Sequence, residues 1–343
     1  MDKYLIALSG GVDSSVAARL MQETGAECVG ATLLLHEGSG EGCESAMAVA
    51  RQLELPFCAF PAQEEFRAHV MGPFCRSYLG GATPNPCIRC NRYLKFGLLL
   101  DKARQLGCSH VVTGHYARVE YHAPTGRWLL RKAVDEAKDQ SYFLACLSQK
   151  QLSACKFPLG EMTKGEIRAL AAGYGLVTAQ KKDSQDICFI PDGDYVSFLK
   201  EFTGMELPAG DFVDGEGKIL GRHEGLACYT VGQRRGLGIA WEHPLYVTEL
   251  SPLDNTVRLG KNEDLFTSRL QAGDVNLVAL SSLSHPVRCM AKIRYRHTPA
   301  PAKAWVEGET LFVEFQEPQR AVTKGQTVVL YHDDLVLASG IIC

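Results

Sequence analysis

The sequence of 343 residues has no long apolar run. None of its segments approaches the roughly eighteen consecutive apolar residues that a membrane-spanning helix needs. The first apolar run, at residues 4–8, is five residues long, which is too short for the core of a signal peptide. We therefore expect a cytosolic protein that makes no contact with a membrane.

The sequence also has little net charge and no regular cysteine framework. Its 36 Lys and Arg against 39 Asp and Glu give a formal net charge of -3, which argues against a wholly basic nucleic-acid binder. A local basic face is still enough to bind phosphates, so RNA stays open as a partner. The 13 cysteines are odd in number and scattered, unlike a secreted disulfide framework. We expect most of them to be buried as small apolar side chains and a few to do chemistry.

Three patterns follow one another along the chain. Residues 1–202 alternate strand-like apolar runs with helical spacing, which predicts an α/β domain whose parallel sheet is covered on both faces and binds ligands at the carboxyl ends of its strands. Residues 203–270 are rich in glycine and predict a small β-rich central domain. Residues 271–343 predict a C-terminal antiparallel β-barrel or sandwich. In the first domain we expect strands at 4–8, 28–35, 56–60 and 110–113, and helices up to residue 21 and at 45–53, 64–79 and 91–106.

A glycine-containing loop, Ser9-Gly10-Gly11-Val12-Asp13-Ser14-Ser15, follows the first expected strand. Its glycines let the backbone turn sharply and bring N–H groups close to an anion, and Ser14 or Ser15 could cap the helix that follows. The loop lacks the lysine of a P-loop and the third glycine of a dinucleotide fingerprint. A plain turn between strand and helix is the alternative.

Two cysteines stand in settings that favour reactivity. Cys90 is expected at the start of a helix between two arginines, which would lower its thiol pKa, and Cys188 follows Lys181 and Lys182. The Cys87-x-x-Cys90 pair could be half a zinc site, a redox disulfide, or a coincidence around one reactive cysteine. A zinc site would need two more ligands, and the sequence has no second pair of this kind. Taken alone, the segment around Cys188 could be an edge strand with its cysteine facing the core.

Six segments together occur in the order and at the spacing of one known family: 9–14, 83–92, 113–116, 138–144, 181–190 and 229–239. Through them the chain resembles the bacterial tRNA-specific 2-thiouridylases over nearly its full length, and its first loop is similar to that of the N-type (PP-loop) ATP pyrophosphatases. The resemblance implies a PP-loop domain, a central β domain and a tRNA-binding barrel. It implies that ATP adenylates O2 of the wobble uridine in tRNAs for Lys, Glu and Gln. A cysteine persulfide then delivers sulfur to C2.

The same resemblance implies roles for residues. Cys188 resembles the persulfide carrier and Cys90 the cysteine that releases the sulfur, with a transient Cys90–Cys188 disulfide as the result. The implied ATP-binding residues are Ala7, Leu8, Ser9, Gly10, Gly11, Val12, Asp13, Ser14, Leu33 and Gly114. The implied tRNA-binding residues are Asn85, Pro86, Cys87, His115, Lys138, Asp139, Gln140, Arg294, Tyr295 and Gln326.

The resemblance also implies ligands and partners. Because the loop has no lysine, we expect a divalent cation, most simply Mg²⁺, to balance the charge of pyrophosphate. Asp13 is either one of its ligands or a residue that only holds the turn, and no metal site is predicted beyond this. The sulfur donor should be a cysteine desulfurase or a sulfur-relay protein, and we expect a monomer.

Two segments depart from the family pattern. Cys87 stands where the family has aspartate, so a carboxylate that could hydrogen-bond the uracil edge is lost. The new thiol gives Cys90 a neighbour for a local disulfide, which leaves open which of the two cysteines resolves the persulfide. The segment 37–44 is short and rich in glycine for the family, which could alter the nucleotide lid.

A basic run lies in the last domain. We expect one strand over residues 287–296, with Arg288, Lys292, Arg294 and Arg296 on one face. This face is either a stripe that binds phosphates or an ordinary solvated surface.

Two other functions stay open. An amide-forming synthetase with the same loop would adenylate a carboxylate and would need neither Cys90 nor Cys188. A tRNA-binding or sulfur-carrying protein without turnover would not need the loop. Pyrophosphate release separates them, because the synthetase would release it without tRNA and the binding protein would release none.

Overall fold

A parallel sheet forms the centre of the first part of the chain. The computed structural model describes residues 2–181 and 187–343, so Lys182, which we expected beside Cys188, lies outside the described residues. Within them, five strands pair in the order β3-β2-β1-β4-β7, and every neighbouring pair is parallel. The strands are β1 (Lys3–Ala7), β2 (Glu27–Leu34), β3 (Phe57–Pro61), β4 (His110–Val112) and β7 (Cys155–Lys156). The predicted α/β architecture is confirmed.

Helices cover both faces of this sheet. Tyr4 and Ile6 of β1 point into one hydrophobic cluster and Leu5 into another, because successive side chains of a strand face opposite sides. The cluster around Ile6 is completed by three helices, which are α1 (Val12–Glu23), α2 (Gly40–Gln52) and α9 (Lys164–Gly173).

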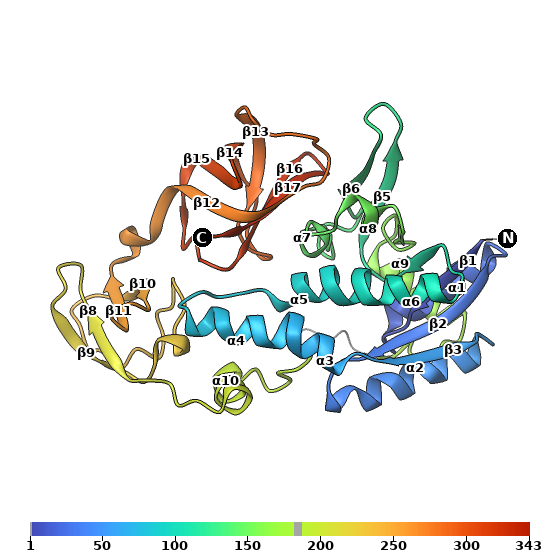
Figure 1. Ribbon diagram of the computed structural model, residues 1–343, viewed down its shortest axis with the longest axis horizontal. Coiled ribbons are helices and arrows are strands. Elements are labelled where there is room, and N and C mark those ends of the chain that lie inside the picture. Colours follow the sequence, from blue (N-terminus) through green and yellow to red (C-terminus); the bar gives the residue numbers. More distant parts are fainter. Residues whose placement is uncertain (1, 182–186) are drawn as a thin grey trace.

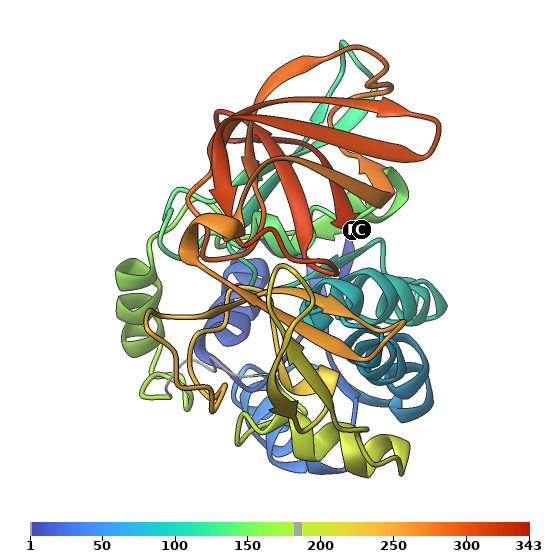
Figure 2. The ribbon, with the colours of Figure 1, turned by 90° about the vertical axis from the view of Figure 1, so that its left-hand side faces the viewer.

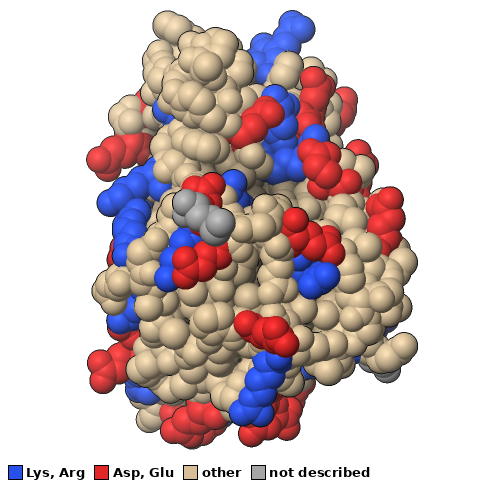
Figure 3. All heavy atoms as spheres, turned by 90° about the vertical axis from the view of Figure 1, so that its right-hand side faces the viewer, with Lys and Arg blue, Asp and Glu red and all other residues tan. Residues whose placement is uncertain are grey.

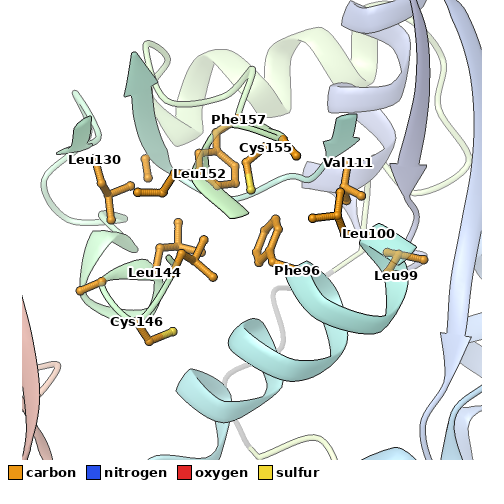
Figure 4. Close-up of a cluster of buried hydrophobic side chains, with 14 of the residues drawn as sticks. Phe96, Leu99, Leu100, Val111, Leu130, Leu144, Cys146, Leu152, Cys155 and Phe157 are labelled. Carbon is orange, nitrogen blue, oxygen red and sulfur yellow. The ribbon is translucent and has the colours of Figure 1, made fainter. Parts of the chain in front are cut away.

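The other face is covered by a helical run of three consecutive elements. α5 (Pro86–Arg89) leads into the π-helical segment η3 (Cys90–Leu98), and α6 (Leu99–Gln105) follows. Figure 4 shows Phe96 and Leu100 of this run pointing toward Val111 and Phe157 in the buried core. A second run made of α3 (Gln63–Phe66), π-helical η2 (Arg67–Met71) and α4 (Gly72–Leu79) packs against it.

Shorter elements complete this part of the chain. Of these, the sequence did not suggest the antiparallel hairpin of β5 and β6. The elements are η1 (Glu37–Ser39), β5 (Ala117–His122), β6 (Arg127–Lys132), α7 (Ser141–Leu144), α8 (Gln149–Leu152) and α10 (Tyr195–Thr203).

The glycine-rich segment after α10 folds into a small β module. Its strands pair in the order β10-β11-β8-β9 around a core that includes Phe212, Val247 and Val257. Glycine at 225 is required because its backbone has φ +139 and a Cβ there would lie 2.6 Å from Cβ of Leu207. The elements are β8 (Gly210–Val213), β9 (Ile219–His223), η4 (Leu226–Cys228), β10 (Tyr246–Ser251), β11 (Thr256–Gly260) and η5 (Asn262–Leu265).

The last strands form a closed antiparallel barrel, which confirms the prediction for the C-terminal part. They pair in the order β12-β15-β14-β13-β16-β17, and pairing of β12 with β17 closes the ring and removes its free edges. The strands are β12 (Phe266–Leu277), β13 (Val287–Lys292), β14 (Ala300–Glu307), β15 (Thr310–Arg320), β16 (Thr327–His332) and β17 (Leu335–Ile342).

The expected strand over 287–296 is too long. β13 ends at Lys292, and the chain bends over residues 293–296, where the amide of His297 donates to the carbonyl oxygen of Arg294. Arg294 and Arg296 therefore do not continue the strand face of Arg288 and Lys292, and the predicted single stripe is wrong.

The β5–β6 hairpin joins the barrel to the parallel-sheet part. Leu335 of β17 pairs with Arg131 of β6, so the hairpin extends the barrel sheet. Arg118 and Arg131 both form ion pairs with Asp334, at 2.6 and 2.7 Å. Figures 1 and 2 show the barrel and the β8–β11 module next to each other, with the loop between α4 and α5 reaching toward both.

Charge is mixed on the end of the molecule formed by the parallel-sheet part. Figure 3 shows Lys and Arg interspersed with Asp and Glu over this face. Within residues 2–181 and 187–343, no helix is both long and apolar enough to span a bilayer.

Candidate active site

The phosphate loop lies at the carboxyl ends of β1 and β4. The chain leaves β1 toward β2 on one side and enters β4 on the other, which is the position where open α/β sheets bind ligands. Gly114, just after β4, touches the loop: a Cβ there would lie 2.7 Å from the carbonyl carbon of Asp13 and from the amide nitrogen of Ser14. Gly10 has φ +71, and a Cβ there would lie 2.5 Å from Cβ of Ser45. Both glycines are therefore needed for the close approach of these segments.

Internal hydrogen bonds hold the loop in shape. The hydroxyls of Ser14 and Ser15 donate to the carbonyl oxygen of Gly11 at 3.1 and 2.8 Å, and the amide of Ser9 donates to Oγ of Ser14 at 3.2 Å. The helix N-cap is Gly11, with no side-chain cap. Our expectation that Ser14 or Ser15 caps α1 is therefore wrong, because the helix begins earlier. The uncapped N–H groups of its first turn suit an anion.

Two lysines from distant segments reach the loop. Nζ of Lys164, at the start of α9, lies 2.7 and 2.9 Å from the carboxylate oxygens of Asp13, which also accepts from the hydroxyl of Tyr116 at 2.8 Å. Nζ of Lys181 donates to the carbonyl oxygen of Gly10 at 3.0 Å and to Oγ of Ser45 at 3.1 Å. Sequence reasoning missed both cations, since neither lies within the loop.

The remaining expected nucleotide residues lie around this loop. Ala7 ends β1, Leu8 is buried with its amide bonded to the carbonyl oxygen of Ala31, and Leu33 lies on the adjacent strand β2 and packs against the core. The segment 37–44 forms η1 and the start of α2 and lies against Gly10, where the carbonyl oxygen of Gly42 would be 2.9 Å from an added Cβ.

Three thiols come together beside the η3 helix. Cys90 is 8% exposed, whereas Cys87 and Cys188 are exposed. Cys90 belongs to the same buried cluster as Phe189 and Ile190, the residues that follow Cys188. The thiol charges of Cys87 and Cys188 each raise the pKa of Cys90, so the three lie within electrostatic range. The structure thus brings the two predicted catalytic cysteines together.

Cys188 lies on a turn and not on an edge strand. The amide of Ile190 donates to the carbonyl oxygen of Ile187 at 2.8 Å, which closes a turn around Cys188. The edge-strand interpretation is therefore wrong. An exposed turn keeps this thiol accessible from outside.

The expected low pKa of Cys90 is also wrong. Burial raises the pKa of Cys90 to about 12, and the helix start at Asn85 lies a full turn away from this thiol. The neighbouring arginines point elsewhere: Arg89 donates to the carbonyl oxygen of His69 at 2.7 Å, and Arg92 pairs with Asp274 at 2.6 Å. Cys87 and Cys188 have exposed surface, but the protein around each thiol removes part of its hydration, and this desolvation raises the pKa of both.

The charge that opposes burial at these thiols belongs to Lys95. Its field also lowers the pKa of His115, which burial lowers well below the ordinary value. His115 is therefore neutral at pH 7, and its Nδ1 lies 2.7 Å from Oγ1 of Thr113. Sequence reasoning missed Lys95; its only signal was a lysine inside the helix that begins with Cys90.

The expected tRNA-binding residues fall into two groups. In the first, Asn85 caps the helix by accepting from the amide of Cys87 at 3.1 Å, and Pro86 is buried beside it. The side-chain Nε2 of Gln326 donates to the carbonyl oxygen of Thr83 at 2.7 Å and so ties the barrel to this loop.

The second group joins the loop before α7 to the barrel. Asp139 is buried and accepts hydrogen bonds from Ala133 and Ser141, while Oε1 of Gln140 accepts from the amide of Tyr116 at 3.0 Å. The ring of Tyr295 lies 4.4 Å from that of Phe143, which follows this loop. Nη1 of Arg294 donates to the carbonyl oxygens of Arg320 and Ala321 at 3.3 Å, and Lys138 belongs to the same loop as Asp139.

No group of three or more His, Cys, Asp or Glu among the described residues could hold a metal ion. The structure therefore gives the zinc interpretation of Cys87 and Cys90 no further ligands within that part of the chain.

Family models match the chain in three consecutive pieces. Residues 2–192 match the tRNA methyl transferase HUP domain, residues 196–261 the tRNA methyl transferase PRC-barrel domain, and residues 267–342 the aminomethyltransferase beta-barrel domain.

Three relatives that match over nearly their full length carry the same name. The tRNA-specific 2-thiouridylase MnmA of Clostridioides difficile is 44% identical over 352 residues, covering 99% of this chain and 98% of that protein. The protein of the same name from Geotalea uraniireducens is 47% identical over 354 residues, with 98% and 94% covered. That from Heliobacterium modesticaldum is 46% identical over 358 residues, with 99% and 92% covered. With this identity along its whole length, the chain belongs to the tRNA-specific 2-thiouridylase family.

Proposed function

We propose that this protein is an enzyme that uses ATP to replace O2 of the wobble uridine of tRNA by sulfur. One observation supports this above all: the phosphate loop and the thiols meet at the same edge of the sheet. Gly114 contacts the loop, and His115 is the next residue. The charge of Lys95 lowers the pKa of His115 and also that of Cys90 and Cys188, so Lys95 is near all three side chains. An adenylated base held at Gly114 would thus lie close to a sulfur nucleophile.

The first step is adenylation. O2 of the uracil attacks the α-phosphorus of ATP, the bond from this phosphorus to pyrophosphate breaks, and N3 of the base loses its proton to water. The base then carries AMP on O2, and N3 takes a proton back from water when sulfur has replaced O2. The N–H groups of the loop and of the first turn of α1, together with Lys181, would bind the phosphates. The residues at the loop fit ATP in this way, because uncapped donors and a lysine converge there.

Mg²⁺ would enter with ATP and neutralise the charge of the leaving pyrophosphate. Asp13 is the carboxylate of the loop and could hold the metal. It is bonded to Lys164 and Tyr116, so its other role is to fix the turn.

The second step is sulfur transfer. The persulfide of Cys188 attacks C2, and AMP leaves with the former O2. The thiolate of Cys90 then attacks Sγ of Cys188, the bond to the outer sulfur breaks, and its electron pair stays on the sulfur now bound to C2. The products are 2-thiouridine and a Cys90–Cys188 disulfide, which an external dithiol must reduce.

We propose three domains, 1–202, 203–270 and 271–343, and a tRNA-binding surface that runs over the last one and the loops beside it. It would contain the two groups that the structure separates, one at Asn85, Pro86, Cys87 and Gln326, the other at Lys138, Asp139, Gln140, Arg294 and Tyr295. His115 would contact the tRNA between them. The tRNAs for Lys, Glu and Gln are the expected substrates.

The exposed turn of Cys188 suits a protein donor. A cysteine desulfurase or sulfur-relay protein could place its persulfide against Cys188 without opening the fold, because this thiol is exposed while Cys90 is buried. We propose that the enzyme works in this way as a cytosolic monomer.

Cys188→Ser tests the proposed function. With tRNA, ATP, Mg²⁺ and a persulfide source, the variant should release pyrophosphate near the wild-type rate but form no 2-thiouridine, which mass spectrometry of tRNA nucleosides detects. Cys343→Ser, at another exposed cysteine, is the control and should keep both activities. Formation of 2-thiouridine by Cys188→Ser would overturn the sulfur-carrier role. Pyrophosphate release by the wild type without tRNA would favour an amide-forming synthetase instead.

A further inference from the structure

Lys95 lies one π-helical turn after Cys90. The η3 segment closes hydrogen bonds between residues five apart, as the amide of Leu99 shows by donating to the carbonyl oxygen of Leu94. In this register the residue five places after Cys90 lies above it, on the same side of the helix. An α-helical register would have turned the lysine away. The π-helix therefore brings the ammonium group to the thiols.

The neighbours of Lys95 in sequence fix its place independently. Leu94 packs in the cluster that holds Cys90 and Phe189, so it faces the turn of Cys188. The ring of Phe96 lies 5.9 Å from that of His115, so it faces the loop after β4. Lys95 lies between these two contacts, at the boundary between the thiols and the nucleotide loop.

Lys95 acts on a small set of the described titratable groups. The titratable groups that feel its field are the thiols of Cys87, Cys90 and Cys188 and the imidazole of His115. None of the ion pairs within the described residues includes Lys95. Among residues 2–181 and 187–343, the groups that Lys95 acts on are therefore three thiols and one imidazole, and no carboxylate of that part of the chain is paired with it.

We propose that Lys95 is a positioning residue for sulfur transfer, whose ammonium group stabilises the anionic sulfur of Cys188 and of Cys90. This inference rests on the proposed function. The persulfide of Cys188 must be an anion to attack C2, and Cys90 must lose its proton before it attacks Sγ of Cys188. A fixed cation beside both sulfurs favours each anion without itself taking part in bond formation.

Lys95→Met is the variant that tests the inference, with alkylation by iodoacetamide as the readout. Trypsin gives peptide 183–200, which contains Cys188 as its one cysteine, and peptide 77–89, which contains only Cys87. The rate of alkylation of each peptide is followed between about pH 6 and pH 10. Loss of the lysine should raise the pKa of Cys188, so its alkylation at pH 7 should slow roughly tenfold, which corresponds to about one pKa unit.

Three further variants keep the result interpretable. Lys95→Arg should restore most of the rate, since it keeps the charge. Lys102 lies two helical turns further along the same helical run, and its ammonium group lies over the ring of Phe60. Lys102→Met should therefore leave the pH profile of alkylation unchanged. Lys95→Gln replaces Lys95→Met if the apolar side chain prevents folding.

The outcomes separate the inference from the proposed function. A slower, right-shifted profile in Lys95→Met with rescue by Lys95→Arg supports the inference. Coinciding profiles for Lys95→Met or Lys95→Gln and the wild type overturn it, even if the wild type makes 2-thiouridine. Absence of 2-thiouridine from the wild-type reaction overturns the proposed function whatever the alkylation profile shows.

Discussion

The phosphate loop and the thiol cluster share one edge of the sheet but are built in opposite ways. The loop is a continuous segment whose serines, glycines and aspartate are held by short contacts to one another and to Lys164 and Lys181. The thiol cluster is assembled from two segments about a hundred residues apart in sequence, one in a π-helix and one on an exposed turn. Burial and one lysine set the chemistry of its sulfurs.

The difference follows from what each half of the reaction needs. Stabilising charge on a leaving pyrophosphate requires donors that are already in place, so a rigid loop serves best. Sulfur transfer requires two sulfur atoms to come within bonding distance, about 2.05 Å, and then to separate again. Cys90, with its pKa raised to about 12, is almost wholly protonated at neutral pH and is unreactive until its surroundings change.

Replacing the buried thiol should have the largest effect on the formation of 2-thiouridine. Cys90→Ser should lower 2-thiouridine below detection, because a serine hydroxyl cannot displace the sulfur from Cys188. Cys87→Ser, at the exposed thiol one turn earlier, is the matched variant and should keep more than half of the activity. Mass spectrometry of tRNA nucleosides measures both. If Cys87→Ser is the more damaging change, Cys87 and not Cys90 resolves the persulfide in this chain.

A change in the phosphate loop should instead affect adenylation, the first step of the reaction. Gly10→Ala forces a residue with φ +71 to carry a Cβ placed 2.5 Å from Cβ of Ser45, so the loop must shift. We expect tRNA-dependent pyrophosphate release to fall roughly 100-fold, as for a misplacement of about 1 Å at a reacting group.

Gly25→Ala is the control for that prediction. Gly25 has φ +77 but nothing within 4 Å of an added Cβ, so the substitution carries the same backbone strain without a clash. It should cost about 1 kcal/mol of stability and leave pyrophosphate release unchanged. Equal loss of activity in both variants would show that strain alone, and not the contact with Ser45, explains the effect.

The two halves also differ in how far the sequence predicts them. A local pattern locates the phosphate loop, because contiguous residues such as Gly10 and Gly11 determine its turn and an apolar strand comes directly before it. Its cations were missed, since Lys164 and Lys181 reach it from other elements. The alternation of strand-like and helical segments predicts the parallel sheet, and the short alternating runs after residue 270 predict the barrel.

The thiol cluster shows why local patterns fail elsewhere. The arginines beside Cys90 suggested a low pKa, but the helix turns them toward His69 and Asp274 and buries the thiol instead. The lysine that does act on Cys90 stands five residues away, and only a π-helical register brings it there. The attachment of the β5–β6 hairpin to the barrel has no local signal either, because its partner strand β17 lies some two hundred residues further along the chain.

The smallest expected effect concerns Lys181, a cation that reaches the phosphate loop from another segment of the chain. Lys181 donates to the carbonyl oxygen of Gly10 and to Ser45, so it supports the loop and adds a positive charge beside the phosphates. Lys181→Met should raise KM for ATP about tenfold, the value of one charge-assisted hydrogen bond of about 1.4 kcal/mol, with little change in the maximal rate. Lys150→Met, at an exposed lysine of α8, should change neither. Initial rates of pyrophosphate release over a range of ATP concentrations give both constants. If the maximal rate falls while KM stays constant, Lys181 stabilises the reacting phosphate and not bound ATP. Adenylation at the phosphate loop would then depend on the same segment of chain that leads to Cys188.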